Sequence, residues 1–271
     1  MLDPTRRVER KAWRTGRFAG GERIIPEETA IAFTYNGSSY AVMMATPQDL
    51  EDFAIGFSLT ERIVASPAEI ESLEIIEEPI GIELRMHLIE PHATAFRERR
   101  RYLAGPTGCG LCGIESLSEA MRTPISIDDT TTFSPKDIMA ALDALSGMQA
   151  INQKTRAVHG AAFYRRGDGV IALREDVGRH NALDKLAGAL ARKGISGRGG
   201  LGLLTSRLSV ELIQKAAAVG IPVLVAVSAP TALAVRTAEA AGVTLAAIAR
   251  NDGFEIFTHP HRIKEDVHVL A

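Results

Sequence analysis

Apolar and polar positions alternate in one way in the first half of the chain and in another way in the second half. In residues 29–45, TAIAFTY and SYAVMMA flank Asn36-Gly37, the dipeptide most typical of a tight β-hairpin. In residues 47–64, apolar side chains recur at helical spacing, which predicts an amphipathic helix. Alternating stretches between residues 70 and 90 predict further strands. We therefore expect a small α+β domain here.

The second half of the chain predicts a different architecture. SPKD at 134–137 has the residues of a helix start, with Ser134 as N-cap, and a hairpin is predicted where AAFYRR and GVIALRED flank residues 167–169. From residue 178 onward, helical segments alternate with apolar strands at 201–205, 222–228 and 243–249, and a further strand follows at 254–258. Apolar strands joined by helices are typical of a parallel sheet that is covered on both faces.

The polar, turn-rich residues 124–133 lie between these two patterns. We accordingly predict one domain over residues 1–130 and a second over residues 131–271. The predicted fold class is α/β, with a smaller α+β domain at the N-terminus.

Composition and charge narrow the class of protein. The chain is 46% hydrophobic and 24% charged, as in ordinary soluble globular proteins, and its net charge of −2 gives no overall attraction to nucleic acid or anionic lipid. Basic residues gather in the first 27 residues and in RERRR at 97–101, either as solvated surface or as a platform for an anionic ligand or acidic partner. The N-terminus is charged where a signal peptide is apolar, so we expect a cytoplasmic protein.

The two cysteines, Cys109 and Cys112, form a CxxC in TGCGLCG at 107–113. Structural zinc needs four ligands, and no H-x-E accompanies the pair as in zinc deaminases, so no metal site is expected. The surrounding glycines predict an exposed loop, and a helix expected over 114–122 would favour a thiolate before it. Nucleophilic sulfur transfer is the favoured interpretation. Thiol–disulfide exchange and a pair of inert buried cysteines remain alternatives.

Polar residues also gather in REDVGRHNALDK at 174–185, at a predicted strand-to-helix junction. They form either a polar helix cap or a ligand site at the carboxyl end of a strand, to which His159 in RAVHGAAF contributes. The loops TSR at 205–207, SAPT at 228–231 and ARNDG at 249–253 each follow an apolar strand. Such loops present backbone N–H groups and hydroxyls to phosphates. A Walker A motif is absent from the sequence, and the glycine-rich GRGGLG at 197–202 precedes its predicted strand, so we interpret it as a linker.

These groups of residues, in this order, closely resemble the formate dehydrogenase accessory sulfurtransferase family (FdhD). The matching segments are TGCGLCGIE at 107–115, VHGAAF at 158–163, EDVGRHNALDK at 175–185, ELIQKAAAVGIPVLVAVSAPTALAV at 211–235 and FTHP at 257–260. The chain departs from the family pattern at TSR, where SGR is expected, and at VHGAA, where VHAAA is more usual. Arg207 and a hydroxyl group are retained in TSR.

The resemblance implies a sulfur carrier that takes sulfur from a cysteine desulfurase. The sulfur passes to the molybdenum cofactor, bis-molybdopterin guanine dinucleotide, before the cofactor enters formate dehydrogenase. The resemblance also implies a homodimer and a cytidine-deaminase-like, three-layer α/β/α domain at the C-terminus. Neither nucleic acid nor a membrane is expected as a partner.

Site residues carry over from the family by position. Cys109 corresponds to the persulfide-bearing cysteine of a sulfurtransferase, and Cys112 to its partner. The cofactor-binding residues that we predict, partly from the resemblance and partly from the strand ends, are Ile248, Ala249, Arg250, Asn251, Asp252, Gly253, His159, Arg179 and Ser206. Two rival functions remain, namely a chaperone that binds the cofactor without carrying sulfur, and a thiol oxidoreductase.

Overall fold

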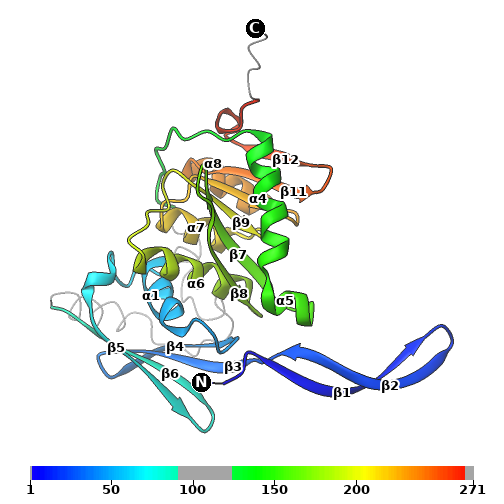
Figure 1. The fold of residues 1–271 in the computed structure, drawn as a ribbon. Coiled ribbons are helices and arrows are strands. Elements are labelled where there is room, and N and C mark those ends of the chain that lie inside the picture. Colours follow the sequence, from blue (N-terminus) through cyan, green and yellow to red (C-terminus); the bar gives the residue numbers. More distant parts are fainter. Residues whose placement is uncertain (1, 91–123, 266–271) are drawn as a thin grey trace.

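The computed structural model describes residues 2–90 and 124–265. These residues form a two-stranded arm, a four-stranded sheet with one long helix, and a six-stranded sheet with helices (Figure 1). The elements before residue 91 are β1 (Thr5–Arg14), β2 (Arg17–Pro26), β3 (Thr29–Tyr35), β4 (Ser38–Ala45), α1 (Leu50–Thr60), a 3-10 turn (Pro67–Glu69), β5 (Ile70–Glu78) and β6 (Gly81–Leu88).

The four-stranded sheet has the order β4-β3-β6-β5. Its predicted first hairpin is confirmed, and Asn36 and Gly37 both take a positive φ, as the tight turn requires. Helix α1 covers one face of the sheet, where Phe33 of β3 stacks on Phe57 with ring centroids 4.1 Å apart. The other face has no helix among the described residues, and Val42 and Met44 are exposed on it.

The second part of the chain forms the six-stranded sheet, in the order β12-β11-β10-β9-β7-β8. Its elements are α4 (Pro135–Met148), α5 (Ala150–Thr155), β7 (His159–Arg165), β8 (Gly169–Asp176), α6 (Arg179–Arg192), β9 (Leu201–Leu204), α7 (Val210–Ala218), β10 (Val223–Ala226), α8 (Ala232–Ala241), β11 (Thr244–Arg250), β12 (Gly253–Thr258) and a 3-10 turn (Pro260–Arg262).

The predicted parallel arrangement is confirmed for β9, β10 and β11, which helices connect. The remaining strands make the sheet a mixed one. The hairpin β7–β8 joins the sheet antiparallel to β9, and β12 turns back antiparallel along β11. A two-residue connection between β11 and β12 leaves no room for a crossover helix, so the antiparallel pairing follows directly from the loop length.

Helices lie on both faces of the six-stranded sheet. Apolar side chains of α6, α7 and α8 pack on one face, and Ile138, Ala141 and Leu145 of α4 pack on the other. Helix α4 begins with the predicted capping box, in which Ser134 and Asp137 bond each other's backbone N–H groups. The fold is therefore mixed α/β, and the cytidine-deaminase-like layering stays a prediction. In the described ranges no helix is both long and apolar enough to cross a bilayer.

The two parts of the chain meet where α1 crosses α6. Two glycines allow the close approach: a Cβ on Gly56 would lie 1.7 Å from the backbone oxygen of Asp184, and a Cβ on Gly188 would lie 1.9 Å from that of Asp52. The two helix backbones are thus in direct contact. The predicted domain boundary near residue 130 stays a prediction.

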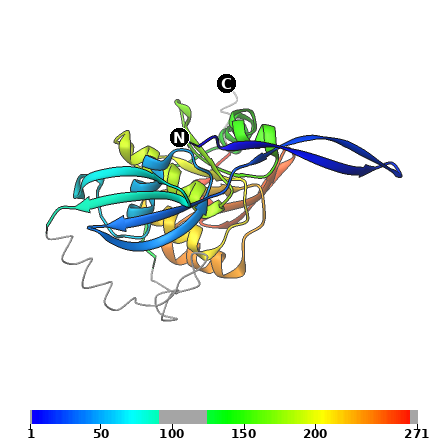
Figure 2. The same ribbon diagram turned by 90° about the horizontal axis from the view of Figure 1, so that it is seen from below.

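The arm formed by β1 and β2 (residues 5–26) was not expected from the sequence. Its strands pair antiparallel along their full length, and Thr15 and Gly16 at the tip both take a positive φ. Figures 1 and 2 show it projecting away from the rest of the molecule. Because water contacts both faces of most of the arm, its sequence lacks the polar–apolar alternation that marks a half-buried strand.

Candidate functional site

One edge of the six-stranded sheet gathers most of the predicted cofactor-binding residues. His159 starts β7, and Asp176 ends β8 directly before α6. Because β7 and β8 run antiparallel to each other and β7 runs antiparallel to β9, these residues lie at the same edge as the carboxyl ends of β9, β10 and β11. We call the region around residues 159, 176–180, 205–209, 227–231 and 248–253 the strand-end edge.

Backbone hydrogen bonds connect the loops of the strand-end edge side by side. The N–H of Gly160 donates to Thr205 Oγ1 at 2.9 Å, next to Ser206. The N–H of Val227 donates to the carbonyl oxygen of Leu204 at 2.9 Å, and that of Ile248 donates to Ser228 at 3.3 Å. The structure therefore brings His159, Ser206 and the 248–253 segment to one edge of the sheet.

Cationic and ionisable groups cluster at the β7 and α6 end of this edge. Helix α6 begins at Arg179, and its N-cap residue Gly178 supplies no side chain to the free N–H groups. Burial lowers the pKa of His159, and the nearby Arg179 and His180 lower it further, while Asp176 opposes the shift. In the part of the chain that the structure describes, Arg179 Nε is buried without a hydrogen-bond partner. This end of the edge thus favours an anion.

His180 is held by two residues that the sequence did not point to. Its Nε2 lies 3.3 Å from Ser209 Oγ and 3.6 Å from Glu211 Oε2. Ser209 is the N-cap of α7, yet its hydroxyl makes no cap hydrogen bond and contacts His180 instead. The neighbouring His180 ring lowers the pKa of Glu211 to about 2. In the sequence, Ser209 and Glu211 resemble an ordinary helix start, so only the fold reveals their link to His180.

The 248–253 segment ends β11 and turns into β12. Ile248 has φ of 54°, a left-handed conformation that is a true outlier for a β-branched side chain. Register shifts interrupt the β11–β12 pairing on both sides of Ala246 and Ala247. Arg250, Asn251 and Asp252 are exposed at the turn. Backbone strain of this kind persists where the surrounding structure imposes it, commonly at ligand sites.

Much of the segment 174–185 performs a structural role instead. Asp176 accepts hydrogen bonds from the N–H groups of Thr46 and Gly178, and pairs with the fully buried Lys185 at 2.6 Å. Arg174 pairs with Asp52 of α1. Asp176 and Lys185 are buried and not solvated, and no side chain caps α6, so these residues form a buried structural cluster and not the solvated helix cap considered above. Arg179 and His180 lie at the strand-end edge.

A second buried ion pair joins α6, α7 and α1. Lys215 Nζ donates to both carboxylate oxygens of Asp184, at 2.9 and 3.1 Å, and to Glu61 at 2.8 Å. Thr60 donates to Asp184 at 2.6 Å. Burial opposes the charge on Lys215, but the carboxylates of Asp184 and Glu61 outweigh it and raise the pKa of the ammonium group. Burial raises the pKa of the Asp184 carboxyl, and the contacts from Lys215 and Thr60 oppose that rise. These contacts hold the first part of the chain against the second.

The predicted catalytic pair, Cys109 and Cys112, lies outside the described residues, as do the loop and helix expected around it. Among the residues that are described, no three His, Cys, Asp or Glu side chains are grouped so as to hold a metal ion. The strand-end edge is thus the part of the predicted site whose geometry is defined.

Comparisons with known proteins agree with the segments singled out above. A model of the FdhD/NarQ family matches residues 26–264. A protein of Agrobacterium fabrum named sulfur carrier protein FdhD is 54% identical over 259 residues, which cover 95% of this chain and 96% of the relative. Proteins of the same name from Brucella abortus and Cupriavidus necator are 53% and 47% identical, over 96% and 94% of this chain and 97% and 88% of their own lengths.

A solved structure shares the fold. A crystal structure from Desulfotalea psychrophila, described as that of a candidate formate dehydrogenase accessory protein, superposes with a TM-score of 0.75. The two chains are 23% identical, and the match covers 97% of this chain and all of that one. From the match to the family model and the identity to these relatives along nearly its full length, the chain belongs to the FdhD/NarQ family.

Proposed function

We propose that this protein is a sulfur carrier, a sulfurtransferase of the cytoplasm that serves the maturation of formate dehydrogenase. Membership of a family whose relatives are named sulfur carrier proteins, at about half identity over nearly the whole chain, carries this proposal. The chain also has the cysteines that such chemistry needs, in TGCGLCG at 107–113.

In the proposed first step, Cys109 accepts sulfur from the persulfide of a cysteine desulfurase. The Cys109 thiolate attacks the terminal sulfur of the donor persulfide, a new S–S bond forms on Cys109, and the donor cysteine leaves as a thiolate. Cys112 assists the transfer as the neighbouring thiol. The Cys112 thiolate then attacks the inner sulfur of the Cys109 persulfide, so that a Cys109–Cys112 disulfide forms and the outer sulfur leaves as hydrosulfide for the acceptor. A thiol reductant afterwards restores both cysteines.

The proposed acceptor is the molybdenum cofactor in its bis-molybdopterin guanine dinucleotide form, bound as a substrate by a homodimer. The strand-end edge supports this choice, because the dinucleotide carries phosphates and the edge offers anion-binding groups. Arg179 has a buried donor without a partner among the described residues, and α6 begins there with free N–H groups. His159, Ser206 and the strained 248–253 segment lie along the same edge.

The test of this function is sulfur loading of Cys109. We expect the full-length protein, incubated with a cysteine desulfurase and cysteine, to gain the mass of one sulfur atom on the tryptic peptide that contains Cys109. Cys109→Ala should lose both this gain and the maturation of formate dehydrogenase. Circular dichroism should show that it folds like the unsubstituted protein.

Cys112→Ala is the matched control, since it should still gain sulfur on Cys109. A Cys109→Ala variant that matures formate dehydrogenase normally would overturn the proposal in favour of a chaperone that only binds the cofactor. Reversible Cys109–Cys112 disulfide formation during turnover, without a persulfide, would favour a thiol oxidoreductase instead.

A further inference from the structure

The arm (residues 5–26) has the surface chemistry of a docking element. Seven of its residues are Lys or Arg and two are Glu. At its tip, Trp13 and Phe18 form a tilted aromatic pair whose ring centroids are 4.8 Å apart. Their side chains remain 60% and 62% exposed. Exposed aromatic pairs with basic neighbours are typical of surfaces that bind a protein partner.

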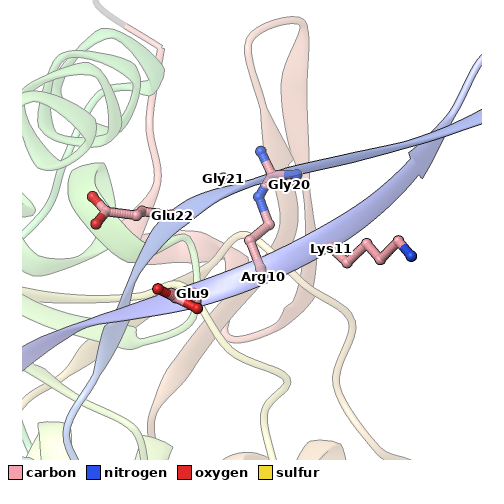
Figure 3. Close-up of a pocket in the computed structure, with 6 residues that line it drawn as sticks. All are labelled: Glu9, Arg10, Lys11, Gly20, Gly21 and Glu22. Carbon is pink, nitrogen blue, oxygen red and sulfur yellow. The ribbon is translucent and has the colours of Figure 1, made fainter.

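The register of the arm separates its two faces. Trp13, Phe18 and Lys11 lie on one face, with Lys11 Nζ 4.8 Å from the centre of the Phe18 ring. Arg14 and Arg17 pair across the strands on the other face. Halfway along, Gly20 and Gly21 leave a shallow hollow without side chains of their own, and Arg10 reaches across it (Figure 3).

The arm makes few contacts with the rest of its own chain. It touches the body near α5, where Arg23 donates to the carbonyl oxygen of Thr155 at 3.1 Å. Further out, no ion pair engages Arg10, Arg14 or Arg17 within residues 2–90 and 124–265. A two-stranded ribbon alone in water is at best marginally stable, so a partner surface is expected to cover it.

A surface that complements the arm lies on the open face of the four-stranded sheet, opposite α1. We call the face that carries Val42, Met44, Glu74, Glu78 and Glu83 the open face. Val42 and Met44 are 55% and 50% exposed, and cross-strand pairing places Ala30 and Ala32 beside them. Glutamates of β5 and β6 border this apolar centre, and Arg85 pairs with Glu83 and lies near Glu74.

We propose that the arm of one copy docks on the open face of a second copy, and that the arm of the second copy docks in the same way on the first. The aromatic tip then covers Val42 and Met44, and the basic side chains face the glutamates of β5 and β6. Charge supports a second copy over other partners: the arm is strongly basic, whereas the chain as a whole has a net charge of −2, so the rest of it is acidic.

The arm is poorly placed to reach the open face of its own copy, because in both views it projects away from the four-stranded sheet (Figures 1 and 2). Its ten-residue strands span about 33 Å, enough to cross a four-stranded sheet. Reciprocal docking makes a closed twofold pair, in which each copy gives one arm and one face. This inference names the surfaces of the homodimer proposed above and is independent of the sulfur chemistry.

Analytical ultracentrifugation of the full-length protein tests the proposal. We expect a dimer whose dissociation constant rises at least tenfold in Trp13→Ser/Phe18→Ser, and equally in Val42→Ser/Met44→Ser. Met148→Ser, which changes a side chain of similar exposure on α4, is the control and should leave the dissociation constant unchanged. Mixing the arm variant with the face variant should restore part of the association, because one intact arm then meets one intact face.

A photoreactive benzophenone side chain at position 13 locates the contact. In a mixture of ¹⁴N- and ¹⁵N-labelled chains, we expect crosslinks between differently labelled copies, to peptides within β4 or β6. A monomer at all concentrations, a dimer that neither double variant weakens, or crosslinks to another region or to the same copy would overturn the proposal. Sulfur loading of Cys109, measured on the same variants, reports on the sulfur-carrier function separately.

Discussion

At the scale of single residues, the strand-end edge depends on charges held close together. His159 lies beside Arg179 and His180, so its protonated form is disfavoured both by burial and by these neighbours. An anion bound at the edge would offset that repulsion. The ionisation of His159 therefore reports whether the edge is occupied.

We predict that Arg179→Gln raises the pKa of His159, because the substitution removes a neighbouring cation. Guanosine diphosphate should also raise it in the unsubstituted protein, as its phosphates bring negative charge. The measurement is a pH titration of the His159 ring by NMR. Arg165→Gln, at the far end of β7, is the control and should leave the pKa unchanged. A nucleotide that binds without moving the pKa would place the anion elsewhere.

The sign of the same shift gives a stability effect. His159 has a folded pKa below its ordinary value of 6.5, so the unfolded chain binds that proton more readily than the folded one. The contribution of His159 to stability is therefore complete above pH 6.5 and falls as the pH drops toward the folded pKa. In the Arg179→Gln variant this dependence should become weaker.

At the scale of elements, the crossing of α1 and α6 fixes how the two sheets are joined. The crossing depends on Gly56 and Gly188, where the helix backbones touch. Arg192 of α6 adds ion pairs to Glu51 and Asp52 of α1. The contact is therefore tight at its centre and charged at its border.

We predict that Gly56→Ala destabilises the protein by about 2–3 kcal/mol, since the added Cβ lies 1.7 Å from a backbone oxygen and forces the helices apart. Gly147→Ala is the matched control: Gly147 is also helical, and its added Cβ meets nothing within 4 Å. It should stabilise α4 by roughly 0.5–1 kcal/mol. Urea unfolding of both variants measures the two effects, and equal values would contradict the packing argument.

Most elements were predictable because their signals are local. Asn36-Gly37, the Ser134–Asp137 capping box and the apolar strands from residue 201 onward each specify structure within a few residues. The arm was missed because its strands bury neither face. The link from His180 to Ser209 and Glu211 was missed because it joins segments that only the sheet topology brings together.

At the scale of the whole molecule, buried charges hold the first part of the chain against the second. Asp184 is fully buried, and its partners come from α1 and α7. Two further buried groups, Asp176 and Lys185, reach the backbone of Thr46. Removing one partner leaves the other charge buried and uncompensated, which costs far more than an exposed ion pair is worth.

We predict that Lys215→Met lowers the free energy of unfolding by about 3–5 kcal/mol, because the carboxylate of Asp184 then has no cationic partner. Asp184→Asn/Lys215→Met should recover most of this loss, since neither buried site then carries a charge. Chemical denaturation of the single and double variants gives the comparison. A double variant as unstable as the single one would show that the pair acts through packing and not through charge.

The glycine crossing also has a consequence for genetics. At Gly56 and at Gly188 the obstacle to a larger residue is the backbone of the opposite helix, which no substitution makes smaller. A defect caused by a side chain at one glycine therefore has no suppressor at the other. Selections for revertants should return glycine itself at the affected codon, or changes elsewhere that raise stability generally.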